Sequence, residues 1–322
     1  MNILILSDLN IAGQCTFLMQ AINKHTPHKA RCIIAYDDVF SYDYDILLSR
    51  GEFEEAQYLA KDWADFYHFG SYIFNFPGVD FNELVRPDNC CIKYYGSYLR
   101  DNGLKCKRYH EHTGIKAITG TDWTITSLLG QSFYHLGSYF TRFGGMAVSE
   151  IPRCAPYNKG DVLRIGCSSA GHPAKGYAIL EQAIDELVQE GYKVALDKIS
   201  GMSNKDCLKR KRTNHVNFCS LAGGWGISGV ESMFMGQPTM TFLDSFVLSL
   251  YPDQPSILID RNNLKEQIKL FFDPLLWAQY SEKSYRFAIR NFCWGTIIAK
   301  YMYIIDLIRN GHTKLPEVIY NA

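Results

Sequence analysis

The sequence predicts an α/β protein with two domains, each built around its own parallel sheet. Short apolar strands alternate with amphipathic helices, the alternation stops at a segment with two prolines and a glycine at 151–161, and a second series follows. The length of 322 residues also suits two domains of roughly 150 residues each.

The first series begins with an apolar strand at 2–7, a turn at 8–13 and a helix at 14–25. Strands that alternate with helices form parallel sheets covered on both faces, so we expect such a sheet in a first domain spanning 1–155. The later members are strands at 32–35, 46–48, 66–68 and 91–95, with helical character at 53–63.

The second series follows the same plan, in a domain predicted to span 160–285. It has a strand at 162–167, a loop at 168–176 and a helix at 177–190 that Gly191 ends. A C-terminal segment, 285–322, is expected to place a helix at about 285–310 back on the first domain. The other elements are a strand at 193–199, a basic helix at 205–212, a strand at 216–219, a glycine-rich turn at 223–229 and a helix from about 230 to Gly236.

The composition disfavours several functional classes, among them nucleic-acid-binding, zinc-binding and membrane-spanning proteins. The chain carries 33 basic and 33 acidic residues, so no overall basic field favours nucleic acid or an anionic membrane. Its 10 cysteines include no CxxC pair and no zinc spacing, which indicates buried thiols in a reducing compartment. The chain enters a strand at once, with no signal-peptide pattern and no run of ~18 apolar residues, so we expect a cytoplasmic protein without a membrane span.

A glycine-bearing loop from Gly166 to Gly176 follows a strand and opens a helix. Its free amides and the helix N-terminus would therefore face an anion, and Lys175 adds a full charge at that edge. The alternative is a plain turn with a solvated lysine.

The segment from Gly223 to Pro238 has four glycines within its first seven residues, which lets a backbone approach a ligand closely. Ser228 is the predicted N-cap of the following helix, and Glu231 stands at capping-box spacing from it. A carboxylate in the first helical turn would also accept hydrogen bonds from a vicinal diol such as a ribose. In the alternative, Glu231 is only a cap.

Together these motifs resemble those of the GT-B glycosyltransferases of the family 4 type, which have two Rossmann-like domains facing each other across a cleft. The resemblance covers most of the chain and is strongest over 164–238. It rests on Lys175-Gly176 and on a "GxSxxEaMaxGxP" element at 226–238. Nearer the N-terminus, segments at 10–13, 67–70 and 96–100 resemble the family's first glycine loop, its "HFG" strand end and its "GSdxR" loop.

The resemblance implies transfer of a sugar from a nucleoside-diphosphate sugar to an acceptor hydroxyl, with retained configuration and without a metal or other cofactor. The acceptor class is a glycan, a small molecule or a modified nucleic acid. Lys175 would contact the donor diphosphate and Glu231 the nucleotide ribose. The donor-binding residues implied in full are Gly13, Ser168, His172, Lys175, Gly226, Ser228, Gly229, Val230 and Glu231.

The acceptor side of the cleft is implied to include Tyr95 and Ser97, with His68 and Arg100 as candidate catalytic residues. His68 stands at a strand end, where it would touch sugar hydroxyls or transfer a proton. A hydrogen-bonded structural histidine is the alternative. The basic run at 209–212 is interpreted as a solvated helix face rather than as a nucleic-acid contact.

Three positions depart from the family's pattern. Gly223 stands where the family has a second glutamate that touches the donor sugar, His172 where it has an arginine, and Tyr95 where many members have a histidine. Diphosphate binding is therefore expected, while the base and sugar of the donor are not predicted. The alternatives are a GT-B enzyme acting on modified DNA bases, a sugar-nucleotide epimerase, and a catalytically idle nucleotide-binding module.

Overall fold

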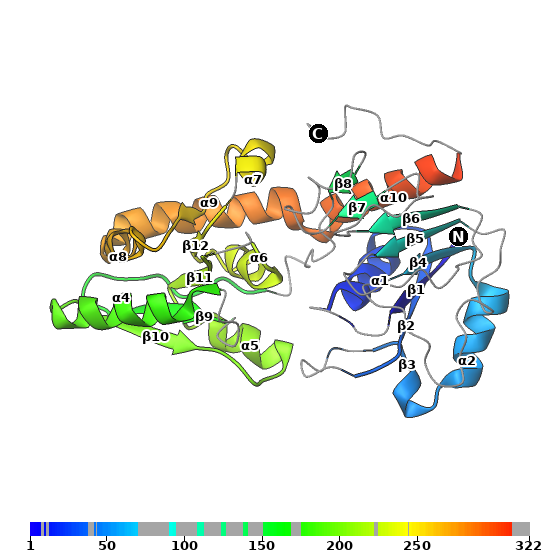
Figure 1. Ribbon diagram of the computed structural model, residues 1–322, viewed down its shortest axis with the longest axis horizontal. Coiled ribbons are helices and arrows are strands. Elements are labelled where there is room, and N and C mark those ends of the chain that lie inside the picture. The colour runs from blue at the N-terminus through cyan, green and yellow to red at the C-terminus, as the bar shows by residue number, and fades with distance from the viewer. Residues whose placement is uncertain are drawn as a thin grey trace. The chain divides into compact units, whose positions relative to one another are not determined.

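The computed structural model (Figure 1) divides the chain into two compact units. The first comprises Met1–Gly145 and Trp294–Ala322, and the second Met146–Cys293. The structure describes residues 1–7, 10, 13–37, 42, 44–69, 90–94, 108–112, 124–126, 138–140, 151–168, 175–221, 225–243 and 245–310.

The first unit contains a parallel sheet in the order β3-β2-β1-β4-β5-β6-β7-β8. β1 is an interior strand of this sheet, and its apolar residues Ile3, Leu4 and Ile5 are fully buried. The strands are β1 (Asn2–Ser7), β2 (Lys29–Ile34), β3 (Ile46–Leu47), β4 (Phe66–Phe69), β5 (Cys90–Tyr94), β6 (Arg108–His112), β7 (Thr124–Thr126) and β8 (Ser138–Phe140).

Helices of the first unit come from both ends of the chain. α1 (Gln14–His25) follows β1, and α10 (Trp294–Arg309) packs against it. At this contact Lys24 Nζ lies 5.3 Å from the centroid of the Trp294 ring. The helical segment expected at 53–63 is α2 (Phe53–Tyr58) continued by a π-helical turn, η3 (Leu59–Trp63), after the short 3-10 helix η2 (Leu48–Arg50).

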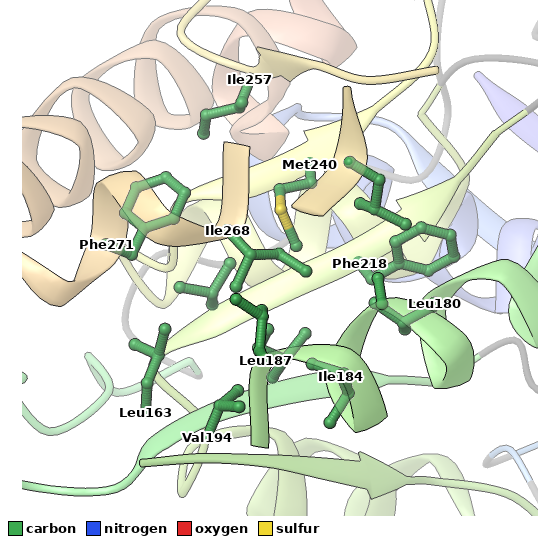
Figure 2. Packing of buried hydrophobic residues seen from close by; sticks show 14 of the residues in the cluster. Leu163, Leu180, Ile184, Leu187, Val194, Phe218, Met240, Ile257, Ile268 and Phe271 are labelled. Atoms are coloured by element: carbon green, nitrogen blue, oxygen red, sulfur yellow. The ribbon is translucent and has the colours of Figure 1, made fainter. Parts of the chain in front are cut away.

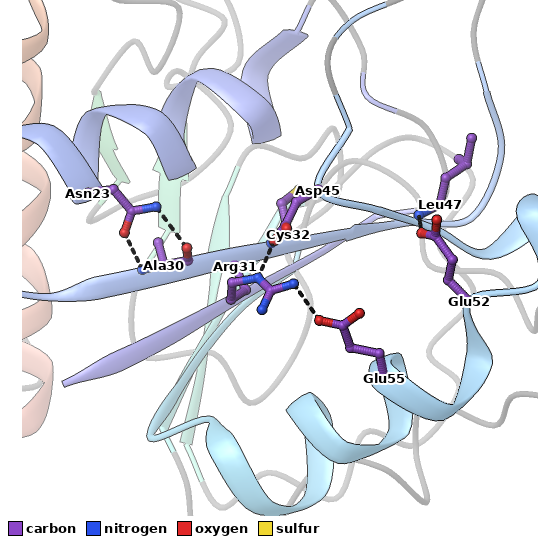
Figure 3. A network of polar contacts seen from close by, with 8 residues as sticks. All are labelled: Asn23, Ala30, Arg31, Cys32, Asp45, Leu47, Glu52 and Glu55. Atoms are coloured by element: carbon purple, nitrogen blue, oxygen red, sulfur yellow. Dashed lines mark hydrogen bonds and ion pairs between the residues drawn. The ribbon is translucent and has the colours of Figure 1, made fainter.

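A polar network fixes β2 against its neighbours (Figure 3). Arg31 donates from Nε to Asp45 at 2.6 Å and from Nη2 to Glu55 of α2 at 2.7 Å. The same Asp45 oxygen accepts from the backbone N–H of Cys32 at 2.9 Å. The carboxylate of Asp45 therefore ties β2 to the segment leading into β3, and Glu55 ties α2 to the same strand.

The second unit also contains a parallel sheet, in the order β10-β9-β11-β12-β13. Its strands are β9 (Leu163–Cys167), β10 (Val194–Lys198), β11 (Val216–Ser220), β12 (Thr239–Thr241) and β13 (Ile257–Leu258). Its helices are α4 (Tyr177–Gln189), α5 (Asn204–Lys211), α6 (Ile227–Phe234), α7 (Ser245–Leu250), α8 (Leu264–Lys269) with the 3-10 turn η7 (Leu270–Phe272), and α9 (Pro274–Phe292).

The core of the second unit lies between its sheet and the helices that cover it (Figure 2). Leu180, Ile184 and Leu187 repeat at helical spacing on α4, so one face of that helix is apolar and buried. They pack with Ile165 of β9 and Phe218 of β11 in the same cluster. Each such side chain contributes about 1.5–3 kcal/mol through its burial.

The C-terminal region has two helices where the sequence predicts one at 285–310. α9 begins at Pro274, with Asp273 as its N-cap accepting from the Leu275 N–H at 2.9 Å. It ends at Phe292 because Cys293 is extended, with φ −68° and ψ 151°. α10 then begins at Trp294 and belongs to the first unit. None of the helices seen in the described residues is long and apolar enough to cross a membrane.

Candidate functional site

The strand order of the second sheet reverses at β9. The chain passes from β9 to β10 on one side and then returns to place β11 on the other. In open parallel sheets, ligands bind beyond the carboxyl ends of the strands at such a switch point. Ser168 leaves the end of β9, and α6 follows the end of β11, so both predicted loops start at this edge.

The end of the first loop is held in place by Gly176 and Leu221. Leu221, just after β11, donates its backbone N–H to the Lys175 carbonyl at 3.0 Å. Gly176 has φ +80°, and a Cβ there would lie 2.4 Å from Leu221 Cδ1, so only glycine fits both the backbone and the space. Lys175 is partly exposed, and no ion pair joins it to another described residue.

The second motif forms α6, but its start differs from the prediction. The helix begins at Ile227 with Gly226 as N-cap and no side-chain cap, so the predicted N-cap role of Ser228 is wrong. Glu231 is consequently beyond the first turn and is not part of a capping box. The amides of Gly229 and Val230 both donate to the Gly226 carbonyl, at 3.0 and 3.3 Å.

The amides that face outward from α6 are therefore those nearest its start. The first N–H groups of a helix have no acceptor within the helix, and here they belong to Ile227 and Ser228. Gly226 is exposed, whereas Gly229 and Val230 are buried behind it. This end of α6 carries the positive pole of the helix dipole and suits an anion.

Glu231 lies in a buried ion pair with Lys211 of α5. Their side chains are 4% and 2% exposed, and Lys211 Nζ lies 2.7 Å from Glu231 Oε2. Asn204, at the other end of α5, donates to Glu231 Oε1 at 3.2 Å. Burying either charge without its partner would cost stability, so each side chain makes the burial of the other possible.

Lys211 is the buried member of this site that the sequence interpretation missed. The basic run at 209–212 was assigned to a solvated face, and three of its members are exposed, but Lys211 is buried. The available signal was helical spacing: Asn204, Leu208 and Lys211 are four and three residues apart and lie on one face of α5.

A hydroxyl pair joins the two predicted loops directly. Ser168 Oγ and Ser228 Oγ form a short hydrogen bond, so the end of β9 and the first turn of α6 meet at the switch point. Lys211 Nζ also donates to Ser228 Oγ at 3.1 Å and to the Ser228 carbonyl at 2.7 Å. The candidate donor-binding residues Ser168, Ser228 and Glu231 are thus parts of one hydrogen-bonded group.

The first sheet has an equivalent switch point between β1 and β4, where Gly13 lies. Gly13 has φ +72° as the N-cap of α1, and a Cβ there would meet the rings of Tyr42 and Phe17 at 2.6 and 2.7 Å. The side chain of Asn10 caps α1 instead, accepting from the N–H of Cys15 at 3.1 Å. Gly13 is therefore tightly packed.

His68 at the end of β4 is buried and 3% exposed. Its Nδ1 lies 3.1 Å from the Tyr301 hydroxyl of α10. Burial lowers the pKa of His68 to about 3, so the ring is neutral in the folded protein. These contacts favour the structural alternative for His68 over proton transfer to a substrate.

The remaining candidates, Tyr95, Ser97, Arg100 and His172, lie outside the described residues, as does Gly223. Within the described part of the chain, no group of three or more His, Cys, Asp or Glu side chains could hold a metal ion.

Comparison with protein-family models and with curated proteins gives no match. Solved glycosyltransferase structures, in contrast, share the fold. An α-glucosyltransferase in complex with UDP and a 13-mer DNA containing a HMU base aligns at a TM-score of 0.67 and 12% identity, covering 95% of this chain and 99% of that one.

Two further structures align over similar lengths. Anabaena HepE in complex with UDP-glucose gives a TM-score of 0.62 at 11% identity, with 95% of this chain and 99% of that chain covered. A glycosyltransferase from Rickettsia africae gives 0.64 at 10% identity, with 96% and 99% covered. The chain therefore has the α/β fold of these glycosyltransferases, and the predicted GT-B fold class is confirmed.

Proposed function

We propose that this protein is a glycosyltransferase that moves a sugar from a nucleoside-diphosphate sugar, with UDP as the nucleotide, to an acceptor hydroxyl. The observation that carries the proposal is the meeting of Ser168, Lys175 and the start of α6 at the switch point of the second sheet. Glycosyltransferases solved with UDP and with UDP-glucose share this fold over 95% of the chain.

In this proposal the diphosphate lies between Lys175 and the N-terminal amides of α6. A full charge, a helix dipole and free amides together offset the charge of the leaving group, so the reaction would need no metal. The ribose hydroxyls would donate to Glu231. A carboxylate has about four lone-pair sites, so one hydrogen bond on each Glu231 oxygen leaves lone pairs that the hydroxyls of a diol would use.

The proposal also covers the anomeric configuration of the product, the acceptor site and the catalytic residue. The motif resemblance to family 4 supports retention of the anomeric configuration and an acceptor site on the first domain. The neutral, buried His68 leaves Arg100 as the remaining candidate catalytic residue from the sequence. Tyr95 and Ser97 would contact the acceptor.

Calorimetric titration with UDP tests the donor site. Lys175→Ala and Glu231→Gln should each weaken UDP binding by about 1–3 kcal/mol, the scale of a lost charged hydrogen bond. Glutamine keeps an acceptor for Lys211 but removes the charge that balances it, so thermal unfolding must show that this variant is folded before it is titrated. Lys193→Ala is the matched control, because Lys193 immediately precedes β10, at the opposite edge of the sheet. Unchanged affinity in both site variants would overturn the assignment.

Turnover separates an enzyme from an idle nucleotide-binding module. The wild type should release UDP from UDP-glucose or another UDP-sugar, and Lys175→Ala should slow that release. UDP binding without turnover of any UDP-sugar, with or without acceptors, would favour the idle module.

A DNA acceptor is a second candidate, because one of the solved structures with this fold was determined with DNA containing a HMU base. The balanced charge of this chain gives DNA no overall attraction. Labelled sugar transfer from UDP-glucose to an oligomer containing HMU, compared with the same oligomer without it, tests this acceptor. No incorporation into either oligomer would exclude it and leave a glycan or small molecule.

A further inference from the structure

Lys211 is a buried cation that the proposed donor contacts do not use. Its ammonium group has three N–H donors, and three acceptors surround it. These are Glu231 Oε2 at 2.7 Å, the Ser228 carbonyl at 2.7 Å and Ser228 Oγ at 3.1 Å. Each donor can therefore be matched to one acceptor, and the ammonium is held in a single orientation.

The backbone around Lys211 is fixed as well. Gln237, which is 1% exposed, donates from Nε2 to the Lys211 carbonyl at 2.5 Å and to the Asn214 carbonyl at 2.7 Å. These bonds attach the end of α5 to the segment that follows α6. The position of Lys211 relative to Ser228 thus does not depend on the ion pair alone.

The direction of the next hydrogen bond follows from chemistry. An ammonium group can only donate, so Ser228 Oγ accepts from Lys211. A hydroxyl that accepts from a cation becomes a stronger donor and a weaker acceptor, because successive hydrogen bonds polarise one another. Polarisation by Lys211 therefore favours Ser228 as the donor and Ser168 as the acceptor in the hydrogen bond that the two hydroxyls share.

This direction leaves the Ser168 hydroxyl proton without an acceptor among the residues that the structure describes. Ser168 is partly exposed and lies at the end of β9, beside the switch point. We propose that Lys211 is a positioning residue of the donor site. It orders a series of hydrogen bonds from Lys211 to Ser228 and from Ser228 to Ser168, so that Ser168 donates its proton to a phosphate oxygen of the donor.

This inference rests on the proposed function and adds a residue to it. Because Glu231 balances the charge of Lys211, the contribution of Lys211 passes through the two hydroxyls rather than through a long-range field. A purely structural role for Lys211 would make the effect of removing the Ser168 hydroxyl the same whether or not Lys211 is present.

A double-mutant cycle with UDP as the probe tests the coupling. Ser168→Ala should weaken UDP binding about tenfold in the wild-type background, as expected for a hydrogen bond to a charged group. In the Lys211→Met/Glu231→Gln background, which removes both buried charges together, the same substitution should change the affinity less than about twofold. Lys211→Arg retains a cationic donor and should restore most of the Ser168→Ala effect.

Thermal unfolding of every variant shows which proteins are folded before titration. If Lys211→Met/Glu231→Gln is not folded, the effect of Ser168→Ala on UDP affinity is measured in the Lys211→Arg/Ser228→Ala background instead. That background gives the same answer, because Ser228→Ala interrupts the series of hydrogen bonds between residue 211 and Ser168. Equal effects of Ser168→Ala with and without the hydrogen bonds from Lys211 to Ser228 and Ser168 would overturn the inference while leaving the donor site intact. Absence of UDP binding in the folded wild type would overturn the proposed function, and the inference with it.

Discussion

Gly176→Ala tests whether the first loop depends on the space that glycine leaves. An alanine at φ +80° costs about 1–2 kcal/mol, because a Cβ disfavours the left-handed region. Its Cβ would also stand 2.4 Å from Leu221 Cδ1 and 2.9 Å from Leu221 Cβ. Overpacking of this kind costs about 1–3 kcal/mol, so we expect a total loss of roughly 2–5 kcal/mol in unfolding free energy.

Gly191→Ala is the matched control for this variant. Gly191 has φ +88° at the end of α4, and a Cβ there would meet nothing within 4 Å. Its substitution should therefore cost only the backbone term, about 1–2 kcal/mol. The difference between the two variants isolates the clash with Leu221.

Urea unfolding measures both losses, and titration with UDP gives the functional consequence. The Leu221 N–H is bonded to the Lys175 carbonyl, so pushing Leu221 away should also move Lys175 and weaken UDP binding. Gly191→Ala should leave that affinity unchanged. Equal destabilisation by the two substitutions, or unaltered UDP affinity in Gly176→Ala, would refute the reasoning.

Two other predictions concern buried polar groups. In the fold the pKa of His68 is lowered to about 3, but the unfolded chain takes up its proton below about pH 6.5. The free energy of unfolding should therefore fall by about 2 kcal/mol from pH 7 to pH 5 because of His68. In urea unfolding at both pH values, His68→Gln should lack this contribution to the fall. An equal fall in the wild type and in His68→Gln would contradict the prediction. Trp225→Phe breaks a 2.7 Å bond to the buried Ser256 hydroxyl and should cost about 1–3 kcal/mol. Adding Ser256→Ala should recover part of that loss in thermal unfolding, and strictly additive losses would exclude the bond.

Local sequence patterns were enough to predict the strand at 2–7, the helix at 14–25 and the order of strands and helices over 162–220. These elements depend on apolar periodicity and on glycine within a few residues, which a single sequence displays. The motif resemblance had placed both loops of the second unit in one donor site, and the parallel sheet does bring Ser168 and Ser228 together at the carboxyl ends of its strands.

Contacts between distant segments could not be read in this way. The sequence shows the capping-box spacing of Glu231 from Ser228, but its partner Lys211 comes from another helix and is 20 residues away in sequence. The burial of His68 depends on Tyr301, which follows it by 233 residues. In both cases the environment of a charged or titratable group is decided by packing against a segment that is distant in the sequence.

The return of α10 to the first unit sets an order on biosynthesis. Domains fold as units, generally from the N-terminus as the chain is made. Here the second unit is continuous and complete once Cys293 has emerged, whereas the first unit still lacks the helix that brings Tyr301 to His68. The domain that is translated first is therefore the one that finishes folding last. Until then, the nascent chain must keep a buried histidine site and one face of α1 uncovered.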